Sequence, residues 1–377
     1  MKFRVDRDVL AEAVTWTARS LPSRPPVPVL AGLLIEADAQ GTLVLSGFDY
    51  EVSARVEVAA DVEEPGRVLV SGRLLADISR SLPNQPVEVV REGSKVGVTC
   101  GASRFALLTM PVEEYPALPT MPDVAGSIAG DEFIQAVAQV TVAASRDETL
   151  PILTGVRMEI EDDRVTLLAT DRYRLAMREL PWRAASPGTS SVALVRARTL
   201  SEVAKALGTG GEVALALSTG NGHNELIGFE AGGRRTTSLL VDGDYPKVRS
   251  LFPAESPVYA VVATAALTEA VRRVALMAER NTPVRLSFTD GQVTLEAGQG
   301  DDAQASEALE ARLHGDDISI AFNPAFLLDG LGALSTEFVR LSFTQATKPA
   351  VLTGQAGLET SDDVGYRYLL MPVRMAG

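Results

Sequence analysis

The chain has 377 residues, of which 46% are hydrophobic and 22% charged, and its formal net charge is −14. This length exceeds what one hydrophobic core usually supports, so two to four domains are expected. No apolar run approaches the roughly 20 residues of a membrane-spanning helix, and the N-terminus lacks a signal-peptide core, so a cytoplasmic protein without membrane contacts is predicted. The acidic total argues against a wholly basic nucleic-acid binder.

In chain order, the first third predicts a helix, paired strands and a second helix. The helical spacing of Leu10, Ala13, Val14 and Thr17 predicts a helix with one apolar face, which ends at the proline-rich loop 21–28. Apolar runs at 33–37 and 42–48 flank a polar turn, as expected of two strands. A second helix is predicted over 73–82, and its apolar face is formed by Leu75, Ile78 and Leu82.

This plan recurs twice along the chain. The prolines Pro28 and Pro151 lie 151−28=123 residues apart, and Asp49 and Asp171 lie 171−49=122 apart. A period of this size indicates one structural unit used repeatedly. The sequence therefore predicts an α+β protein of three tandem domains, each with two helices among roughly eight antiparallel strands. Their expected ranges are 1–120, 127–253 and 258–377.

The candidates for catalysis have simpler structural explanations. Asp49 and Asp171 recur at equivalent positions, which favours a turn cap or strand end over a carboxylate pair. Asp171 with Arg172, Tyr173 and Arg174 resembles an acid–base cluster, yet no histidine or nucleophile accompanies it. The glycine-rich runs 208–211 and 220–222 read as hairpin turns. No catalytic residue is predicted.

Neither a metal site nor a cofactor is expected. The single cysteine, Cys100, lies in an apolar run and is predicted to be a packed thiol. The two histidines, His223 and His314, have no neighbours at metal-ligand spacing.

Basic residues gather in or beside the predicted helices, while acidic residues concentrate in turns and strands. Spread over several helices, arginine and lysine suit contacts with phosphates that carry no base information. Ordinary solvated charge is the alternative for any one of them. The residues are Arg24, Arg73, Arg80, Arg146, Arg196, Arg198, Lys205, Arg272 and Arg273.

The last residues of the chain are unusually apolar for a terminus. A terminal strand paired into a sheet explains most of this pattern. Met371, Pro372 and Met375 are left over, as expected at the edge of a hydrophobic pocket that accommodates varied peptides.

Six stretches together resemble the bacterial DNA polymerase III beta subunit family, the replicative sliding clamps. They are the MKF start, SRPPVPVL at 23–30, ATDRYRLA at 169–176, LLVDGDYP at 239–246, AFNP at 321–324 and LLMPVR at 369–374. The resemblance covers essentially the whole chain. It implies a head-to-tail homodimer ring whose helices line a hole around double-stranded DNA, bound without sequence specificity.

The resemblance also implies a peptide pocket and a contact between copies. The pocket would accept short linear motifs of the Gln/Leu/Phe type from the DNA polymerase III alpha subunit, the clamp loader, other DNA polymerases and repair proteins. Its residues would be Leu153, Thr170, Arg174, Leu175, Pro246, Leu251, Phe326, Thr347, Leu369, Met371, Pro372, Val373 and Arg374. The contact between copies would join Leu276 and Met277 to Phe105 and Leu107 of the other copy.

Two features separate this sequence from the family pattern or from its own repeat. The family often has Gly-His where this chain has Arg172-Tyr173, which makes the expected pocket rim bulkier and more basic. The second copy also has Arg174-Leu175 after its aromatic residue, and these two residues are matched with Ser53-Ala54, which follow the aromatic residue of the first copy. A peptide-binding scaffold of the same fold that does not encircle DNA remains an alternative, as does an enzyme using Asp171, Arg172 and Tyr173.

Overall fold

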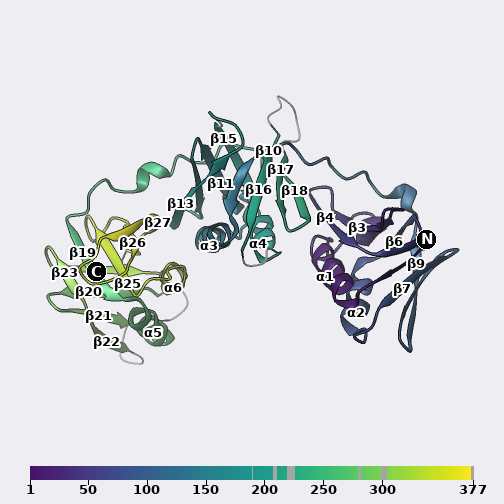
Figure 1. The fold of residues 1–377 in the computed structure, drawn as a ribbon. Coiled ribbons are helices and arrows are strands. Elements are labelled where there is room, and N and C mark those ends of the chain that lie inside the picture. Colours follow the sequence, from purple (N-terminus) through teal and green to yellow (C-terminus); the bar gives the residue numbers. More distant parts are fainter. Residues whose placement is uncertain (189, 207–209, 219–225, 279–281, 299–303, 375–377) are drawn as a thin grey trace. The chain divides into compact units, whose positions relative to one another are not determined.

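The computed structural model describes residues 1–377 apart from 189, 207–209, 219–225, 279–281, 299–303 and 375–377 (Figure 1). The chain forms two compact units. Unit 1 comprises Met1–Asp131, Arg183–Pro187 and Glu202–Leu240, and unit 2 comprises Glu132–Trp182, Gly188–Ser201 and Val241–Gly377. No helix among the described residues is long and apolar enough to span a membrane.

Three consecutive segments repeat one order of elements: a strand, a helix, a 3-10 turn, five strands, a helix and three strands. The first copy consists of β1 (Lys2–Val5), α1 (Arg7–Ala18), η1 (Pro28–Ala31), β2 (Gly32–Ala37), β3 (Thr42–Phe48), β4 (Val52–Ala59), β5 (Asp61–Glu64), β6 (Gly66–Ser71), α2 (Gly72–Ser81), β7 (Val87–Glu92), β8 (Lys95–Cys100) and β9 (Ser103–Met110). The turn η2 (Val112–Glu114) follows it.

The second copy consists of β10 (Val124–Ala129), α3 (Gly130–Thr141), η3 (Pro151–Thr154), β11 (Gly155–Glu161), β12 (Arg164–Thr170), β13 (Arg174–Pro181), β14 (Arg183–Ala184), β15 (Ser190–Arg196), α4 (Ala197–Ala206), β16 (Glu212–Leu217), β17 (Leu226–Ala231) and β18 (Arg234–Leu239). The turn η4 (Arg249–Leu251) follows it.

The third copy consists of β19 (Val258–Ala263), α5 (Thr264–Val274), η5 (Ala275–Met277), β20 (Val284–Thr289), β21 (Gln292–Ala297), β22 (Ala305–Glu310), β23 (Arg312–His314), β24 (Ile318–Phe322), α6 (Pro324–Gly332), β25 (Phe338–Phe343), β26 (Ala350–Gln355) and β27 (Asp362–Leu370). The predicted threefold repeat is confirmed, with nine described strands in each copy where about eight were expected.

Each copy contributes two runs of antiparallel strands, and runs of successive copies join edge to edge. In unit 1, β4 of the first copy pairs with β18 of the second, from Val52↔Ser238 to Val56↔Arg234. In unit 2, β13 of the second copy pairs with β27 of the third, from Arg174↔Leu370 to Arg178↔Tyr366. The corresponding strand of the third copy, β22, pairs only with β21 among the described strands.

Helices pack on one face of these sheets because their apolar residues recur at helical spacing. In unit 1, α1 and α2 lie side by side, and α1 packs against β3 and β4 (Figure 1). The predicted apolar face of α1 is buried, as is that of α2. Asp6 caps α1 by accepting hydrogen bonds from the backbone N–H groups of Asp8 and Val9. The helices predicted in the first copy are therefore confirmed.

Candidate functional site

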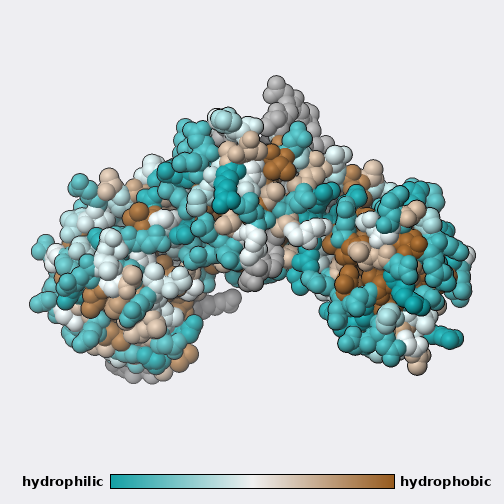
Figure 2. All heavy atoms as spheres, viewed as in Figure 1, coloured by the Kyte–Doolittle hydropathy of each residue, from teal (hydrophilic) through white to brown (hydrophobic). Residues whose placement is uncertain are grey.

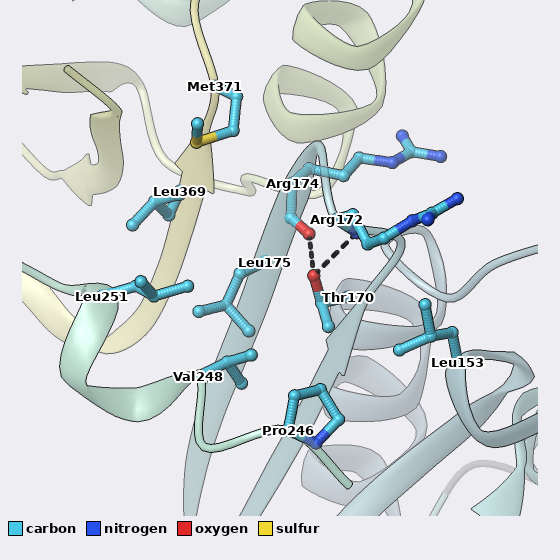
Figure 3. Close-up of a pocket in the computed structure, with 10 residues that line it drawn as sticks. All are labelled: Leu153, Thr170, Arg172, Arg174, Leu175, Pro246, Val248, Leu251, Leu369 and Met371. Carbon is cyan, nitrogen blue, oxygen red and sulfur yellow. Dashed lines mark hydrogen bonds between the residues drawn. The ribbon is translucent and has the colours of Figure 1, made fainter.

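A cavity of about 300 Å³ lies in unit 2, beside the junction of β13 and β27 (Figure 3). Four stretches of chain form its walls: η3, the turn between β12 and β13, the segment leading into η4, and the end of β27. Apolar side chains dominate the lining, which consists of Leu153, Thr170, Arg172, Arg174, Leu175, Pro246, Val248, Leu251, Leu369 and Met371.

Most of the residues predicted for a peptide pocket come together here. Eight of them line the cavity: Leu153, Thr170, Arg174, Leu175, Pro246, Leu251, Leu369 and Met371. Arg172, which was expected at the rim, also lines the cavity, and the structure adds Val248. Val248 lies in an irregular segment without periodicity, so only its neighbour Pro246 could have pointed to it.

Five predicted pocket residues are not among those that line the cavity: Phe326, Thr347, Pro372, Val373 and Arg374. Phe326 lies on α6, where it packs under the Arg174 guanidinium at 4.4 Å. Thr347 is exposed in the turn between β25 and β26. The backbone N–H of Val373 donates to the Ala321 carbonyl at 2.8 Å, so the chain follows β24 after Met371. Met375, also predicted at the edge, lies outside the described residues.

Asp171 shapes the turn that carries the pocket's two arginines. Its Oδ1 accepts hydrogen bonds from the backbone N–H groups of Tyr173 at 3.0 Å and Arg174 at 3.1 Å. The Thr170 hydroxyl donates to the Arg174 carbonyl at 2.6 Å and accepts from the Arg172 N–H at 3.2 Å (Figure 3). These bonds hold Arg172 at φ +79°, a conformation that favours glycine.

The first copy builds the same turn. Asp49 Oδ1 accepts from the N–H groups of Glu51 at 3.0 Å and Val52 at 2.6 Å, and Tyr50 has φ +74°. The prediction that the recurrent aspartates are turn caps is therefore confirmed. The turns also correct the sequence alignment: Arg174 corresponds to Val52, because each begins its strand three residues after the aspartate.

In the corrected register, one cross-strand pair distinguishes the pocket from its counterpart in the first copy. Leu175 of β13 pairs with Leu369 of β27, and both line the cavity. The equivalent pair between β4 and β18 is Ser53 with Thr237, whose buried hydroxyls lie 2.6 Å apart in a hydrogen bond. The first copy thus has a hydrogen-bonded pair of hydroxyls where the second copy has two leucines that line the cavity. The two hydroxyls bond to each other because buried hydroxyls need hydrogen-bond partners.

Arg174 is the most heavily engaged residue of the pocket. Its side chain is 6% exposed and pairs with Asp171 at 2.9 Å and Asp329 at 2.5 Å. Burial by itself lowers the pKa of its guanidinium, but the Tyr368 hydroxyl and the two carboxylates outweigh burial and hold that pKa above its usual range. Burial also raises the pKa of Tyr368, which stays neutral and donates to the Phe326 carbonyl at 2.8 Å.

The residues predicted to contact DNA are exposed on the described structure, except Arg196, which is half-buried. Three of them have an acidic residue three positions earlier on the same helix: Arg80 pairs with Asp77 in α2, Lys205 with Glu202 in α4 at 3.2 Å, and Arg272 with Glu269 in α5 at 2.5 Å.

Apart from the half-buried Arg196, the other predicted DNA-binding residues form two further groups. Arg273 pairs with Glu307 of β22 at 2.6 Å. Four others form no ion pair with any described carboxylate: Arg24, Arg73, Arg146 and Arg198.

The residues predicted for contacts between copies differ in exposure. Leu276 in η5 is 80% exposed, and Met277 and Phe105 are also exposed. Leu107, in contrast, is 3% exposed because alternation along β9 turns its side chain into the core. The side chain of Leu107, predicted to contact the other copy, therefore packs within its own chain, whereas the adjacent Leu108 is 69% exposed. Hydrophobic residues also gather on unit 1 in the face seen in Figure 2, over the region of β3 and β6.

The described residues contain no group of histidine, cysteine, aspartate and glutamate side chains that could hold a metal ion. His223 and most of the glycine-rich runs predicted as turns lie outside these residues. Cys100 is fully buried, and its thiol donates to the carbonyls of Pro83 and Gln85 at 3.2 Å each, as expected of a packed thiol.

Comparison with known proteins identifies relatives along the whole chain. Residues 1–119, 127–247 and 249–374 match the N-terminal, central and C-terminal domains of the DNA polymerase III beta subunit. A beta sliding clamp of Streptomyces coelicolor is 61% identical over 377 residues, covering all of both chains. The beta sliding clamp homolog GriR of Streptomyces muensis is 47% identical and covers 99% of each chain.

Solved structures agree with these relatives. A DNA polymerase sliding clamp from Bacillus subtilis has a TM-score of 0.91 and 28% identity, with complete coverage of both chains. A sliding clamp from Pseudomonas aeruginosa bound to griselimycin also has a TM-score of 0.91 and 28% identity, again over both entire chains. With its three consecutive domain matches and its full-length relatives, the chain belongs to the DNA polymerase III beta subunit family of sliding clamps.

Proposed function

We propose that two copies of this chain close head to tail into a ring around duplex DNA, and that each copy tethers replication proteins through the pocket in unit 2. The family is that of the sliding clamps, non-catalytic processivity factors of DNA replication, so an enzyme and a scaffold that does not encircle DNA are both less favoured.

The repeated pairing of sheet edges carries the proposal of a ring. Strand β4 meets β18, and β13 meets β27, so each copy presents an edge to the next. Continued once more, the pattern pairs β22 with β9 of a second chain. β22 has no described partner on its other side, and β9 pairs with β6 only through Thr109 and Met110. Open edges expose backbone N–H and C=O groups that another strand can satisfy.

Exposed apolar side chains occur in both of the copies that would meet. Leu276 and Met277 are exposed in the third copy, and Phe105 and Leu108 are exposed on β9. A head-to-tail contact would bury these side chains without a change in the fold of either chain. Such a contact closes a ring of two chains when the third copy of each chain pairs with the first copy of the other.

The basic residues of the helices suit contacts with phosphates. Arginine and lysine neutralise the DNA backbone without reading bases, so the contacts are salt-dependent and permit sliding. The ion pairs of Arg80, Lys205 and Arg272 with acids on the same helix are exposed and contribute little to stability, so phosphates can compete for these cations. A closed ring retains DNA by topology, and weak contacts are sufficient.

The pocket suits short linear peptides with apolar side chains. Its walls are predominantly apolar, it is open to solvent at Leu251 and Met371, and its volume fits a few side chains rather than a folded partner. We infer that the DNA polymerase III alpha subunit, the clamp loader, other DNA polymerases and repair proteins dock here in turn. A tethered enzyme then acts at high effective concentration near its template.

Retention on circular DNA tests the proposal. The full chain is loaded by a clamp loader onto a nicked plasmid, separated from free protein by gel filtration, and then exposed to a restriction enzyme that cuts the plasmid once. The ring predicts co-elution with the circle and release after linearisation. Equal loss from circular and linear DNA would contradict the proposal.

A further inference from the structure

Two arginines line the pocket, but their charges are placed very differently. The Arg174 guanidinium is buried between the carboxylates of Asp171 and Asp329 and lies over the ring of Phe326. Two carboxylates more than balance its charge, and its Nε and Nη1 donate hydrogen bonds to them. Arg174 is therefore a positioning residue that ties the β12–β13 turn to α6, and it offers little to a ligand.

Arg172 is the opposite case. Its side chain is exposed, and its guanidinium forms no hydrogen bond or ion pair with any residue in the described part of the chain. The carboxylate of Asp147 feels its charge, and Oδ1 of that carboxylate accepts hydrogen bonds from the Thr149 hydroxyl at 2.6 Å and N–H at 3.0 Å. These bonds, with a smaller contribution from Arg172, lower the pKa of Asp147.

The side chains are arranged with the charge at one end of the pocket. In Figure 3 both guanidinium groups extend away from Leu175, Leu251 and Leu369. Of the two, the Arg174 guanidinium is already paired with carboxylates. Among the residues that line the cavity, a peptide whose apolar side chains fill it therefore meets one cation that no carboxylate balances, Arg172. The backbone of Arg172 is fixed by the Asp171 turn and the Thr170 hydroxyl, so the base of this side chain does not have to be ordered when a ligand binds.

We propose that Arg172 is a specificity residue that favours peptides in which a carboxylate flanks the apolar side chains seated in the pocket. The inference rests on the proposed peptide-binding role of this pocket. A carboxylate accepts charge-assisted hydrogen bonds from the free guanidinium, whereas an amide of the same shape brings no charge. The preference is local to Arg172, because the second cation of the pocket is already paired.

Paired peptides measure this preference directly. The probes are fluorescein-labelled pentapeptides built from Gln, Leu and Phe, in which Asp or Asn occupies each non-anchor position in turn. Dissociation constants are measured by fluorescence anisotropy with the full-length wild-type chain and with Arg172→Asn and Arg172→Lys. Asparagine tolerates the left-handed backbone of this turn, and circular dichroism checks that each variant is folded.

The wild-type chain is expected to bind the Asp peptide about two- to fivefold more tightly than its Asn counterpart at one position or more, the range of a solvent-exposed ion pair. The ratio falls to about one in Arg172→Asn, persists in Arg172→Lys, and shrinks as salt rises. Equal affinity of both peptides for the wild-type chain, or an unchanged ratio in Arg172→Asn, would overturn the inference about Arg172 and leave the proposed peptide pocket standing. Failure of every peptide to bind the wild-type chain would overturn it together with the proposed pocket.

Discussion

At the scale of single residues, the same aspartate-capped turn occurs in the first and second copies, and in the second copy its aspartate has an additional role. Asp49 and Asp171 each accept two backbone N–H groups and force the next residue to positive φ. Only Asp171 has a second task, because its Oδ2 accepts from Arg174 Nε at 2.9 Å in a buried ion pair. The turn is thus the inherited scaffold, and the ion pair is specific to the copy with the pocket.

Substituting both aspartates separates these tasks. Asparagine keeps the Oδ1 acceptor but loses the charge, so Asp49→Asn is expected to change the free energy of unfolding by less than about 0.5 kcal/mol. Asp171→Asn leaves Arg174 with one carboxylate and is expected to cost about 1 to 3 kcal/mol. Urea denaturation followed by circular dichroism measures both. Equal losses in the two variants would show that the ion pair adds nothing to the turn.

At the scale of elements, α6 lies unusually close to β27. A Cβ on Gly330 would lie 2.5 Å from the Tyr368 ring, so only glycine permits this approach. The approach lets the Tyr368 hydroxyl reach the Phe326 carbonyl and places Asp329 beside Arg174. Gly330 therefore supports the pocket from behind without lining it.

Gly330→Ala is expected to force α6 and β27 apart and to lower the free energy of unfolding by about 1 to 3 kcal/mol. Gly332→Ala, two residues later on the same helix, is the matched control, because nothing lies within 4 Å of the added Cβ. There the better helix propensity of alanine predicts unchanged or slightly higher stability. Thermal denaturation distinguishes the two, and a stable Gly330→Ala variant would contradict the close contact.

The turn η4 is held on the sheet by charge. Arg249 donates to Glu159 of β11 at 3.3 Å and to Glu179 of β13 at 2.9 Å. Phe252 follows Leu251 in the chain, and the Arg367 guanidinium lies over its ring, with Cζ 5.0 Å from the ring centroid. These contacts fix the wall of the pocket that Val248 and Leu251 supply.

Removing this connection is expected to weaken the pocket while leaving its lining intact. Arg249→Ala releases η4 and is expected to weaken peptide binding about two- to fivefold, largely through faster dissociation. Arg164→Ala removes another partner of Glu179, 3.6 Å away on β12, without touching η4. Surface plasmon resonance compares the two with the wild-type chain. Identical dissociation rates in all three would exclude a role for Arg249.

At the scale of the whole molecule, the sheets end in edges that a second copy would complete. The proposed contact joins the unpaired side of β22 to the part of β9 before Thr109, which pairs with β8 alone among the described strands. Leu276 is exposed in the third copy and Leu108 in the first. An apolar side chain as exposed as Leu276 has no evident function in an isolated chain, since it neither packs in a core nor lines the pocket.

Leu276→Asp is therefore expected to weaken dimerisation by about tenfold or more, because a carboxylate would lose its water in the contact. Val364→Asp changes another exposed apolar residue of unit 2, outside the proposed contact, and is expected to leave the dimer intact. Sedimentation equilibrium at micromolar concentration gives the mass of each variant. A dimeric Leu276→Asp, or a monomeric Val364→Asp, would contradict the assignment.

Sequence periodicity alone determined the repeats, the helices and the turns. The helical spacing of Leu10 and Val14, and the recurrence of Asp49 and Asp171, depend on neighbours along the chain, and the structure confirms them. The family could also be recognised from short motifs, since these lie in turns and strand ends whose backbone geometry restricts the residues allowed there.

Only the tertiary structure decided which residues share a wall. Val248 joins the pocket through the packing of the segment before η4, which has no periodic signal, and the rim residue Arg172 is set in place by the positive φ of its turn. Leu107 and Leu108 are both leucines on one strand, and the side of the sheet that holds the core determines which is buried. Sequence specifies local geometry because its causes are local, whereas burial and charge balance depend on segments more than a hundred residues apart, such as Arg174 and Asp329.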